Sequence, residues 1–390
     1  MQNRVLKIGF LSTYPPRECG IATFTQDLVR ALKQESGLKT GVIAISDKEY
    51  RYGGDVLFEF PQQDRKSYAD AAERINRSDL QALVVEHEYG IYGGDSGEYL
   101  RYLLGGVKKP VVATLHTVLP EPKEKEKEIL QALCRKSEKV VTMAGNTRRI
   151  LRDVYGVEPG KITVIPHGVP AFDVPPREEL KKQAHLENRT VVSTFGLISP
   201  GKGLEYGIEA VARAAKKHPE VLYLILGRTH PVVVRQEGEA YRERLEKAVD
   251  DLGVRQNVRF VNKYLTKEEL VRYLQLSDIY MTPYLAKDQA VSGTLAYAAG
   301  YGRVIVSTPY LYAQEMLADG RGMLAKFRDA DSLAGCINFL IEHPDERKSM
   351  EQKTLRLGRE MTWDRVAGRY AETFREVCRS GSEGAGGADA

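Results

Sequence analysis

The feature that most constrains the fold is a repeated alternation of short apolar runs with helical patterns. Runs such as VLKIGFLS (5–12) and ALVVEHEYG (82–90) are almost continuously apolar and end in polar residues. Strands of this kind are buried on both faces, and helix-like segments between them are typical of the crossovers of a parallel sheet. The sequence therefore predicts an α/β fold with doubly wound sheets.

This alternation occurs twice along the chain. The first set ends with ITVIPHGV (162–169), a polar segment containing prolines follows at about 173–187, and TVVSTFGLI (190–198) begins the second set. We therefore expect an N-terminal domain over 1–172 and a C-terminal domain over 173–350. Ligands of such sheets bind at the carboxyl ends of the strands, so two domains in series predict a central cleft between those ends.

The last part of the chain reads as one long helix over roughly 345–378. Its apolar positions, which include Trp363, Tyr370 and Phe374, are spaced as one helix face. The tail SGSEGAGGADA (380–390) has nothing to bury, and we expect it to be disordered.

Composition bounds the partners. A formal charge of +4 over 390 residues and the lack of a basic-aromatic surface motif argue against nucleic acid as a partner. Weak attraction to an anionic membrane or acceptor is left open.

No apolar run approaches the roughly 20 residues that cross a bilayer, and the start is not typical of a signal peptide. The four cysteines lie far apart and predict free thiols. We expect a cytoplasmic protein, with peripheral contact at the inner membrane face left open. The sequence predicts no oligomeric state.

The second half carries a candidate anion site. In TFGLISPGKGLEYGIEA (194–210), Lys202 lies just before a helix, and a lysine beside free backbone N–H groups suits a diphosphate. The spacing is not that of a P-loop, and an exposed turn lysine is the alternative. In LILGRTHP (224–231), Arg228 and His230 should point into the same cleft, although His230 could be a simple turn residue.

A second helix start in this half has the same character. The stretch YLAKDQAVSGTLAYAAG (284–300) places Ser292, Gly293 and Thr294 at a turn that enters a helix. The first N–H groups of a helix have no partner within it, and the helix dipole favours an anion there.

Strand ends of the first half supply further candidates. Gly20 lies at the first helix start, where the backbone can approach a ligand, and His116 ends the strand PVVATLHTV (110–118). In EHEYGIYGG (86–94), a strand would place Glu86 and Glu88 on one face and His87 on the other. We interpret Glu86, His87, Glu88 and Tyr89 as acceptor-binding residues, together with His230; a solvated strand end is the alternative.

The order of FGLISPGKG, LILG, an acid-containing loop with its helix, and VIVSTPYLYAQEML resembles the retaining glycosyltransferases of the GT4 family, over nearly the whole chain. The resemblance implies the GT-B architecture, with two Rossmann-like domains and a final helix (351–379) that packs back on the N-terminal domain. It implies a nucleoside-diphosphate-sugar donor held mainly by the C-terminal domain, and a sugar, polysaccharide or lipid acceptor held mainly by the N-terminal domain. It implies no cofactor and no metal.

The family's motifs can be placed on this chain with two departures. The acidic motif, two glutamates separated by seven residues, falls on Asp288 and Ala296, so the second acid is absent. The lysine of the family's phosphate clamp matches Lys202, whereas the arginine position reads Leu197, and Arg228 is the candidate replacement.

Two more residues match the family. Glu315 corresponds to a glutamate at a helix start and could take over the ribose contact. His116 corresponds to the loop histidine near the donor sugar. The expected donor site thus also includes Gly20, Gly196, Ser292, Gly293 and Thr294.

The resemblance implies a front-face reaction that retains the anomeric configuration, in which the leaving phosphate takes the acceptor proton. The donor would be a GDP- or UDP-sugar, and similarity of DQAVSGTLAYAAG and HEYGIYGG to a branch associated with mannose metabolism favours GDP-mannose. Two alternatives stay open: another GT-B enzyme such as an epimerase or a phosphorylase, and a non-catalytic sugar-nucleotide-binding protein.

Overall fold

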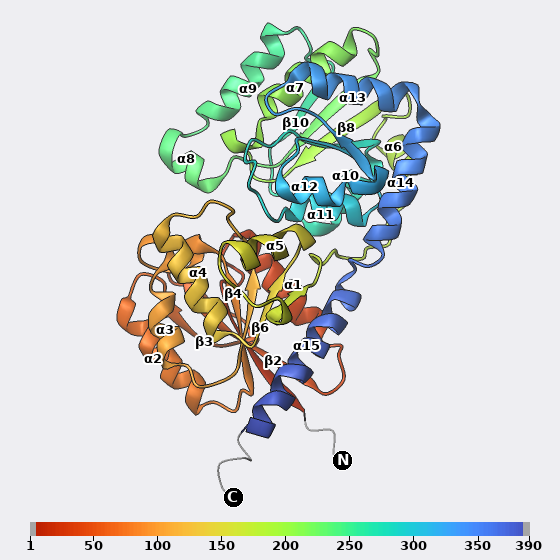
Figure 1. The fold of residues 1–390 in the computed structure, drawn as a ribbon. Helices are drawn as coiled ribbons and strands as arrows, with labels where there is room; N and C mark the ends of the chain where they lie inside the picture. The colour runs from red at the N-terminus through yellow and green to blue at the C-terminus, as the bar shows by residue number, and fades with distance from the viewer. Residues whose placement is uncertain (1–4, 385–390) are drawn as a thin grey trace, which may run out of the picture. The chain divides into compact units, whose positions relative to one another are not determined.

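A computed structural model describes residues 5–384, which form two compact units (Figure 1). The first unit contains the chain up to Gly168 together with the part from Trp363 onward, and the second contains Val169–Thr362. The chain therefore leaves the first unit once and returns to it at its end. The crossing at Gly168 lies slightly before the boundary expected at residue 172.

The first unit is built on a parallel sheet of seven strands in the order β3-β2-β1-β4-β5-β6-β7. Strand β4 is buried along its whole length, as the unbroken apolar run predicts. The strands are β1 (Leu6–Ser12), β2 (Leu38–Ser46), β3 (Val56–Pro61), β4 (Ala82–His87), β5 (Val111–Leu115), β6 (Lys139–Thr142) and β7 (Ile162–Val164).

Helices surround this sheet. The last of them packs beside the first helix, and the Phe374 ring lies edge-on to Phe10 of β1, with 6.1 Å between centroids. The helices are α1 (Gly20–Leu32), α2 (Arg65–Arg77), α3 (Leu100–Gly106), α4 (Glu124–Lys136), α5 (Gly145–Asp153) and α15 (Trp363–Gly384), with short 3₁₀ turns η1 (Tyr89–Ile91), η2 (Asp95–Gly97) and η3 (Pro159–Lys161).

The second unit repeats the plan with a parallel sheet of six strands in the order β10-β9-β8-β11-β12-β13. Val192, Tyr223, Ile225 and Met281 from this sheet join Ile208 in its apolar core. The strands are β8 (Thr190–Phe195), β9 (Val221–Leu226), β10 (Val258–Val261), β11 (Ile279–Thr282), β12 (Val304–Ser307) and β13 (Gly322–Leu324).

The helices of the second unit are α6 (Arg177–Gln183), α7 (Leu204–Ala215), α8 (Pro231–Glu237), α9 (Ala240–Asp251), α10 (Lys267–Leu276), α11 (Gly293–Gly300), α12 (Leu311–Met316), α13 (Ala330–Glu342) and α14 (Pro344–Gly358), with the 3₁₀ turns η4 (Pro200–Lys202) and η5 (Ala318–Gly320). Most of these helices lie between the strands along the chain, whereas α6 precedes β8, and α13 and α14 follow β13. Two parallel Rossmann-like sheets with helices between their strands confirm the predicted α/β fold class.

The prediction of a single long helix over 345–378 is wrong. This segment forms two helices, α14 in the second unit and α15 in the first, separated by residues 359–362. The backbone N–H of Val169 donates to the carbonyl of Met361 at 2.7 Å, and Val169 and Thr362 form a parallel bridge. A continuous helix could not present that extended backbone.

The C-terminal tail is described only in part. Helix α15 extends to Gly384, into the segment expected to be disordered, and 385–390 lie outside the described residues. None of the helices between residues 5 and 384 combines the length and the hydrophobicity that a bilayer crossing requires.

Candidate active site

The carboxyl ends of β8 and β9 meet through two glycines. Gly196 follows β8 with φ +130°, and Gly227 follows β9 with φ +141°. The N–H of Gly196 donates to the carbonyl of Leu226 at 2.9 Å, and a Cβ on Gly227 would lie 2.0 Å from the Gly196 oxygen. The two strand ends therefore touch through bare backbone, which only glycine permits.

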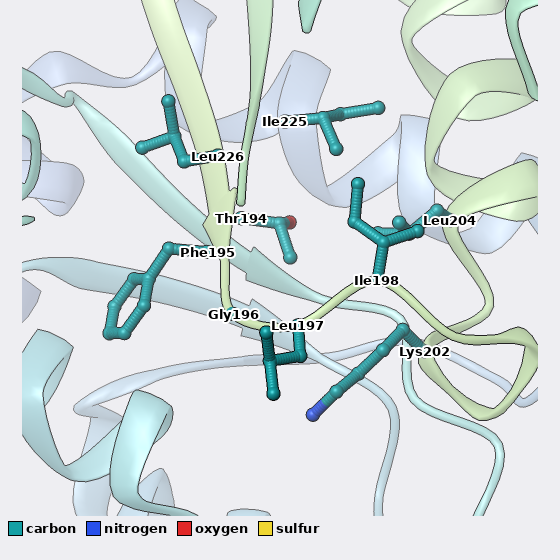
Figure 2. Close-up of a pocket in the computed structure, with 9 residues that line it drawn as sticks. All are labelled: Thr194, Phe195, Gly196, Leu197, Ile198, Lys202, Leu204, Ile225 and Leu226. Atoms are coloured by element: carbon teal, nitrogen blue, oxygen red, sulfur yellow. The ribbon is translucent and has the colours of Figure 1, made fainter. Parts of the chain in front are cut away.

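Lys202 is the last residue of the 3₁₀ turn η4, which follows β8. Figure 2 shows its side chain extended toward Leu197, beside the apolar residues Ile198 and Leu204. Its Nζ lies 3.8 Å from the ring centre of Tyr284. Within residues 5–384 the amine has no hydrogen-bond or ion-pair partner, so its charge is available to a ligand.

The N-terminus of α11 contacts the same tyrosine, Tyr284, through Thr294. Ser292 caps the helix by accepting from the N–H of Leu295 at 3.3 Å. The Thr294 hydroxyl lies 3.1 Å from the Ser292 hydroxyl and 2.9 Å from that of Tyr284. A Cβ on Gly196 would also touch the Thr294 methyl group, at 3.4 Å. The structure thus brings Gly196, Lys202 and the α11 start together, as the sequence predicts, and the connecting residue is Tyr284.

Arg228 and His230 lie on the loop after β9. The Arg228 guanidinium carbon lies 5.5 Å from the ring centre of Tyr264. His230 caps α8, because its Nδ1 accepts from the N–H of Val232 at 3.1 Å. Burial, followed by the positive charges of Lys202 and Arg235, lowers the pKa of His230. His230 therefore has a structural role as a helix cap, and its ring lies within electrostatic reach of Lys202.

Asp288 lies half-buried on the loop before α11. Among the residues that the structure describes, its carboxylate has no hydrogen-bond or ion-pair partner. The loop is anchored to α12, since the N–H groups of Leu311 and Tyr312 donate to the carbonyls of Lys287 and Gln289. The Asp288 carboxylate is therefore held on a fixed loop and remains free to accept hydrogen bonds.

Two other family positions fall in this unit. Glu315 lies in α12, half-buried, and its carbonyl accepts from Arg321 at 2.8 Å. Ala296, which stands where the family has its second acid, is fully buried in α11. A carboxylate at that position would enter an apolar interior, which fits its absence.

The first unit contains a buried acid–imidazole pair. The Nε2 of His116 lies 2.7 Å from Oε2 of Glu86, which is fully buried. Burial raises the pKa of Glu86, and the hydrogen bond and charge of His116 oppose that rise. The His116 ring lies edge-on to Phe24 at 4.7 Å. His116 thus stands after β5 as predicted, held by Glu86 and Phe24.

The prediction that the strand continues through Glu88 is wrong, because β4 ends at His87. Glu88 instead caps the turn η1 by accepting from the N–H of Tyr89 at 3.0 Å, and its other oxygen accepts from Thr117. Tyr92 then folds back, and its hydroxyl donates to the carbonyl of Glu86 at 2.6 Å. Glu86 and Glu88 therefore do not share a strand face.

Burial also changes the interpretation of the acceptor candidates. Glu86 and His87 are fully buried, and neither ring nitrogen of His87 has a hydrogen-bond partner within the described chain. Burial lowers the pKa of His87 to about 3. The Tyr89 hydroxyl donates to the carbonyl of Glu126 at 3.4 Å. Gly20 begins α1, with open space where a Cβ would stand. Glu86 and His87 are therefore closed to an acceptor, whereas Glu88, Tyr89 and His230 are partly exposed and the donor-site candidate Gly20 is exposed.

Sequence reasoning missed the aromatic residues of both sites. Tyr284 begins the stretch YLAKDQAVSGTLAYAAG, in which only Ser292, Gly293 and Thr294 were candidates at the helix start. Next to His116, the ring of Phe24 lies 5.1 Å from that of His167 and 5.2 Å from that of Trp363. Within residues 5–384, no group of three or more His, Cys, Asp or Glu side chains could hold a metal ion.

The two Rossmann-like sheets define the chain as a GT-B protein, and comparison with known proteins gives its family. Residues 19–171 match the sequence model described as Glycosyltransferase Family 4, and residues 176–356 match Glycosyl transferases group 1. The chain belongs to this GT4-like family of glycosyltransferases, which confirms the resemblance seen in the sequence.

Named relatives share low identity. A D-inositol 3-phosphate glycosyltransferase of Acidothermus cellulolyticus is 24% identical over 298 residues, which are 69% of this chain and 62% of that protein. A phosphatidyl-myo-inositol mannosyltransferase of Mycolicibacterium smegmatis is 24% identical over 71% of this chain and 68% of its own length. The match thus spans less than two thirds of the Acidothermus protein.

Solved structures share the fold. Anabaena HepE in complex with UDP and glucose superposes with a TM-score of 0.74 at 17% identity, over 95% of this chain and 100% of that one. Sucrose-phosphate synthase from Thermosynechococcus elongatus superposes with a TM-score of 0.77 at 16% identity, over 96% and 100%.

Proposed function

We propose that this protein is a retaining hexosyltransferase that moves a sugar from a nucleoside-diphosphate donor to a hydroxyl acceptor. The observation that carries the proposal is the unpaired ammonium of Lys202 beside the N-terminus of α11. A lysine and free helical N–H groups together form a site for a diphosphate. Family membership supports glycosyl transfer as the reaction that uses it.

The proposed chemistry follows from where charge develops. As the bond from sugar to diphosphate weakens, negative charge grows on the leaving phosphate oxygen. Lys202 and the N–H groups of Gly293 and Thr294 would stabilise that charge, with Arg228 as a second cation. Preorganised donors of this kind contribute roughly 3–4 kcal/mol each. In the front-face route that the family resemblance implies, the leaving phosphate then takes the acceptor proton, so no separate base is needed.

For the donor sugar and the acceptor we propose chemical classes and the residues that would contact them. Asp288 would accept hydrogen bonds from sugar hydroxyls, and Glu315 would contact the ribose. The name of the Mycolicibacterium relative, a mannosyltransferase, supports mannose as the sugar, for which the sequence resemblance favours GDP-mannose, and the UDP complex of HepE supports a UDP-sugar as the other candidate. The proposed acceptor is a sugar, polysaccharide or lipid hydroxyl. A lipid acceptor would bring a cytoplasmic protein to the inner membrane face.

Thermal-shift binding against UDP, GDP, ADP and their sugar conjugates, with and without magnesium, tests the donor site. One nucleotide should stabilise the wild type, and Lys202→Met should remove that stabilisation without changing the melting temperature of the free protein. Lys216→Met, which changes an exposed lysine at the end of α7, is the matched control and should behave as the wild type. Equal stabilisation of both variants would contradict the proposal.

The buried Ala296 and the Leu197 position favour one alternative, a non-catalytic protein that binds a sugar nucleotide. Selective binding without transfer to any acceptor in a screen of sugars and lipids would favour it. Release of a free, altered sugar would instead indicate an epimerase.

A further inference from the structure

Tyr284 follows β11 and is almost fully buried, with 1% of its surface exposed. The ammonium of Lys202 lies 3.8 Å from its ring centre, and the Tyr310 ring stacks on it at 5.6 Å with an interplanar angle of 16°. The ring is therefore fixed by packing while its π-system contacts the cation. An ammonium so placed is attracted by the ring quadrupole.

The hydroxyl end of Tyr284 reaches the other half of the candidate diphosphate site. It lies 2.9 Å from the Thr294 hydroxyl, which in turn lies 3.1 Å from Ser292, the cap of α11. One side chain thus contacts the cation at its face and the helix start at its tip.

Backbone contacts hold the two segments together. The N–H of Leu285 donates to the carbonyl of Gly201 at 3.0 Å. Gly203 has φ +59°, and a Cβ there would lie 2.2 Å from the carbonyl oxygen of Pro283. The turn that carries Lys202 is therefore packed directly on the segment that carries Tyr284.

We propose that Tyr284 is a positioning residue that holds the Lys202 ammonium beside the α11 N-terminus, ready for the donor diphosphate; this rests on the proposed function. A carboxylate partner would also hold the lysine, but it would neutralise the charge and occupy its N–H donors. A ring face restrains the flexible lysine stem and leaves both the charge and the donors for the ligand. This matters most here, where Leu197 stands at the position of the family's second basic residue.

Pyrophosphate binding, measured by calorimetry, tests the functional consequence. Tyr284→Met removes the ring and should weaken binding roughly five- to tenfold, whereas Tyr284→Phe keeps the ring and should change it less than threefold. Adding Tyr284→Met to Lys202→Met should cause no further loss, because the tyrosine acts through the lysine. Tyr241→Leu, at another buried tyrosine of the same unit, is the packing control and should bind as the wild type.

A second measurement reads the contact itself. In protein whose lysines carry ¹³C-methyl groups, the Lys202 signal, assigned by its loss in Lys202→Met, should be shifted upfield by the ring current in the wild type and in Tyr284→Phe. A Lys202 signal at the position of exposed lysines would overturn the inference, even if Tyr284→Met does not fold. So would equal pyrophosphate affinity of Tyr284→Met and the wild type.

The two proposals fail in different ways. A shifted Lys202 signal in a protein that binds neither pyrophosphate nor any nucleotide contradicts the proposed function, and with it the role assigned to Tyr284. An unshifted signal in a protein that loses pyrophosphate binding on Lys202→Met overturns the positioning role alone.

Discussion

The Nε2 atom of His116 lies 2.7 Å from Oε2 of Glu86, in a region of the first unit that solvent barely reaches. The other carboxylate oxygen of Glu86 has no hydrogen-bond partner within the described residues. His116 is therefore the side chain that compensates a fully buried acid, and the two residues should behave as one unit in stability measurements.

Replacing His116 by Ala should lower the free energy of unfolding by about 3 kcal/mol at pH 7.5, because a buried acid loses its partner. Burial already raises the pKa of Glu86 above 4.5, so the folded state holds its proton at a pH where the unfolded state releases it. The contribution of Glu86 to the free energy of unfolding is therefore fully present below its unfolded-state pKa and is lost as the pH rises through its folded-state pKa. Without His116 that pKa rises further.

Urea unfolding at pH 5.5 and pH 7.5 checks this prediction. The decrease in the free energy of unfolding caused by His116→Ala should be smaller at pH 5.5 than at pH 7.5. The double variant with Glu86→Gln is the control and should show little pH dependence of the loss. The same loss at both pH values in the single variant would contradict the buried pair.

Replacing His87 by Leu should make the protein less sensitive to acid. Burial depresses the pKa of His87 from 6.5 to about 3, so the unfolded state binds the proton first as the pH falls below 6.5. Stability is thus present above pH 6.5 and is lost toward pH 3, by up to about 1.4 kcal/mol per pH unit. The slope of unfolding free energy against pH between 6 and 4.5 should become shallower in His87→Leu. His185→Asn, at an exposed histidine, should leave the slope as it is.

Gly227→Ala should destabilise the second unit by about 3 kcal/mol, because the new Cβ would lie 2.0 Å from the Gly196 oxygen and φ is +141°. Gly253→Ala is the matched control: this residue follows α9 with φ +69°, as is common just after a helix, and nothing lies within 4 Å of the new Cβ. It should cost only about 1 kcal/mol. Chemical unfolding of the two variants compares them directly, and equal losses would argue against a close approach of the strand ends.

Asp288→Ala should lower kcat/KM for the donor that thermal-shift binding identifies, roughly 10- to 150-fold, because a charged acceptor of sugar hydroxyls is lost. The melting temperature should not change, since the carboxylate has no partner within residues 5–384. Asp288→Asn keeps an acceptor and should lose less. Wild-type kcat/KM in both variants would exclude a donor role for Asp288.

The fold could be predicted from the sequence because buried parallel strands are almost unbroken apolar runs, as in β4 and β9, which are buried throughout. The break between α14 and α15 could not, because it depends on pairing of Val169 with Met361 and Thr362, which are distant in sequence.

The candidate site was predictable where topology alone decides it. Gly196, Lys202 and Thr294 meet because the carboxyl ends of parallel strands share one edge of a sheet. Tyr284 was not predictable, since an aromatic residue at a strand end is typical of the core, and its role depends on where the Lys202 side chain lies. Glu86 was expected at an open edge; the return of Tyr92 over it depends on the conformation of a glycine-rich loop.

The contact between Gly227 and the Gly196 carbonyl also limits how this site can diverge during evolution. Neither glycine can gain a side chain without strain. Variants at these two positions should therefore misfold and be removed by selection. Change in substrate preference must instead pass through their neighbours, Leu197 and Arg228, which bring side chains to the same edge. A saturation library at Leu197 and Arg228 is thus the route to enzymes with altered donors, and relatives with different donors should differ there while keeping both glycines.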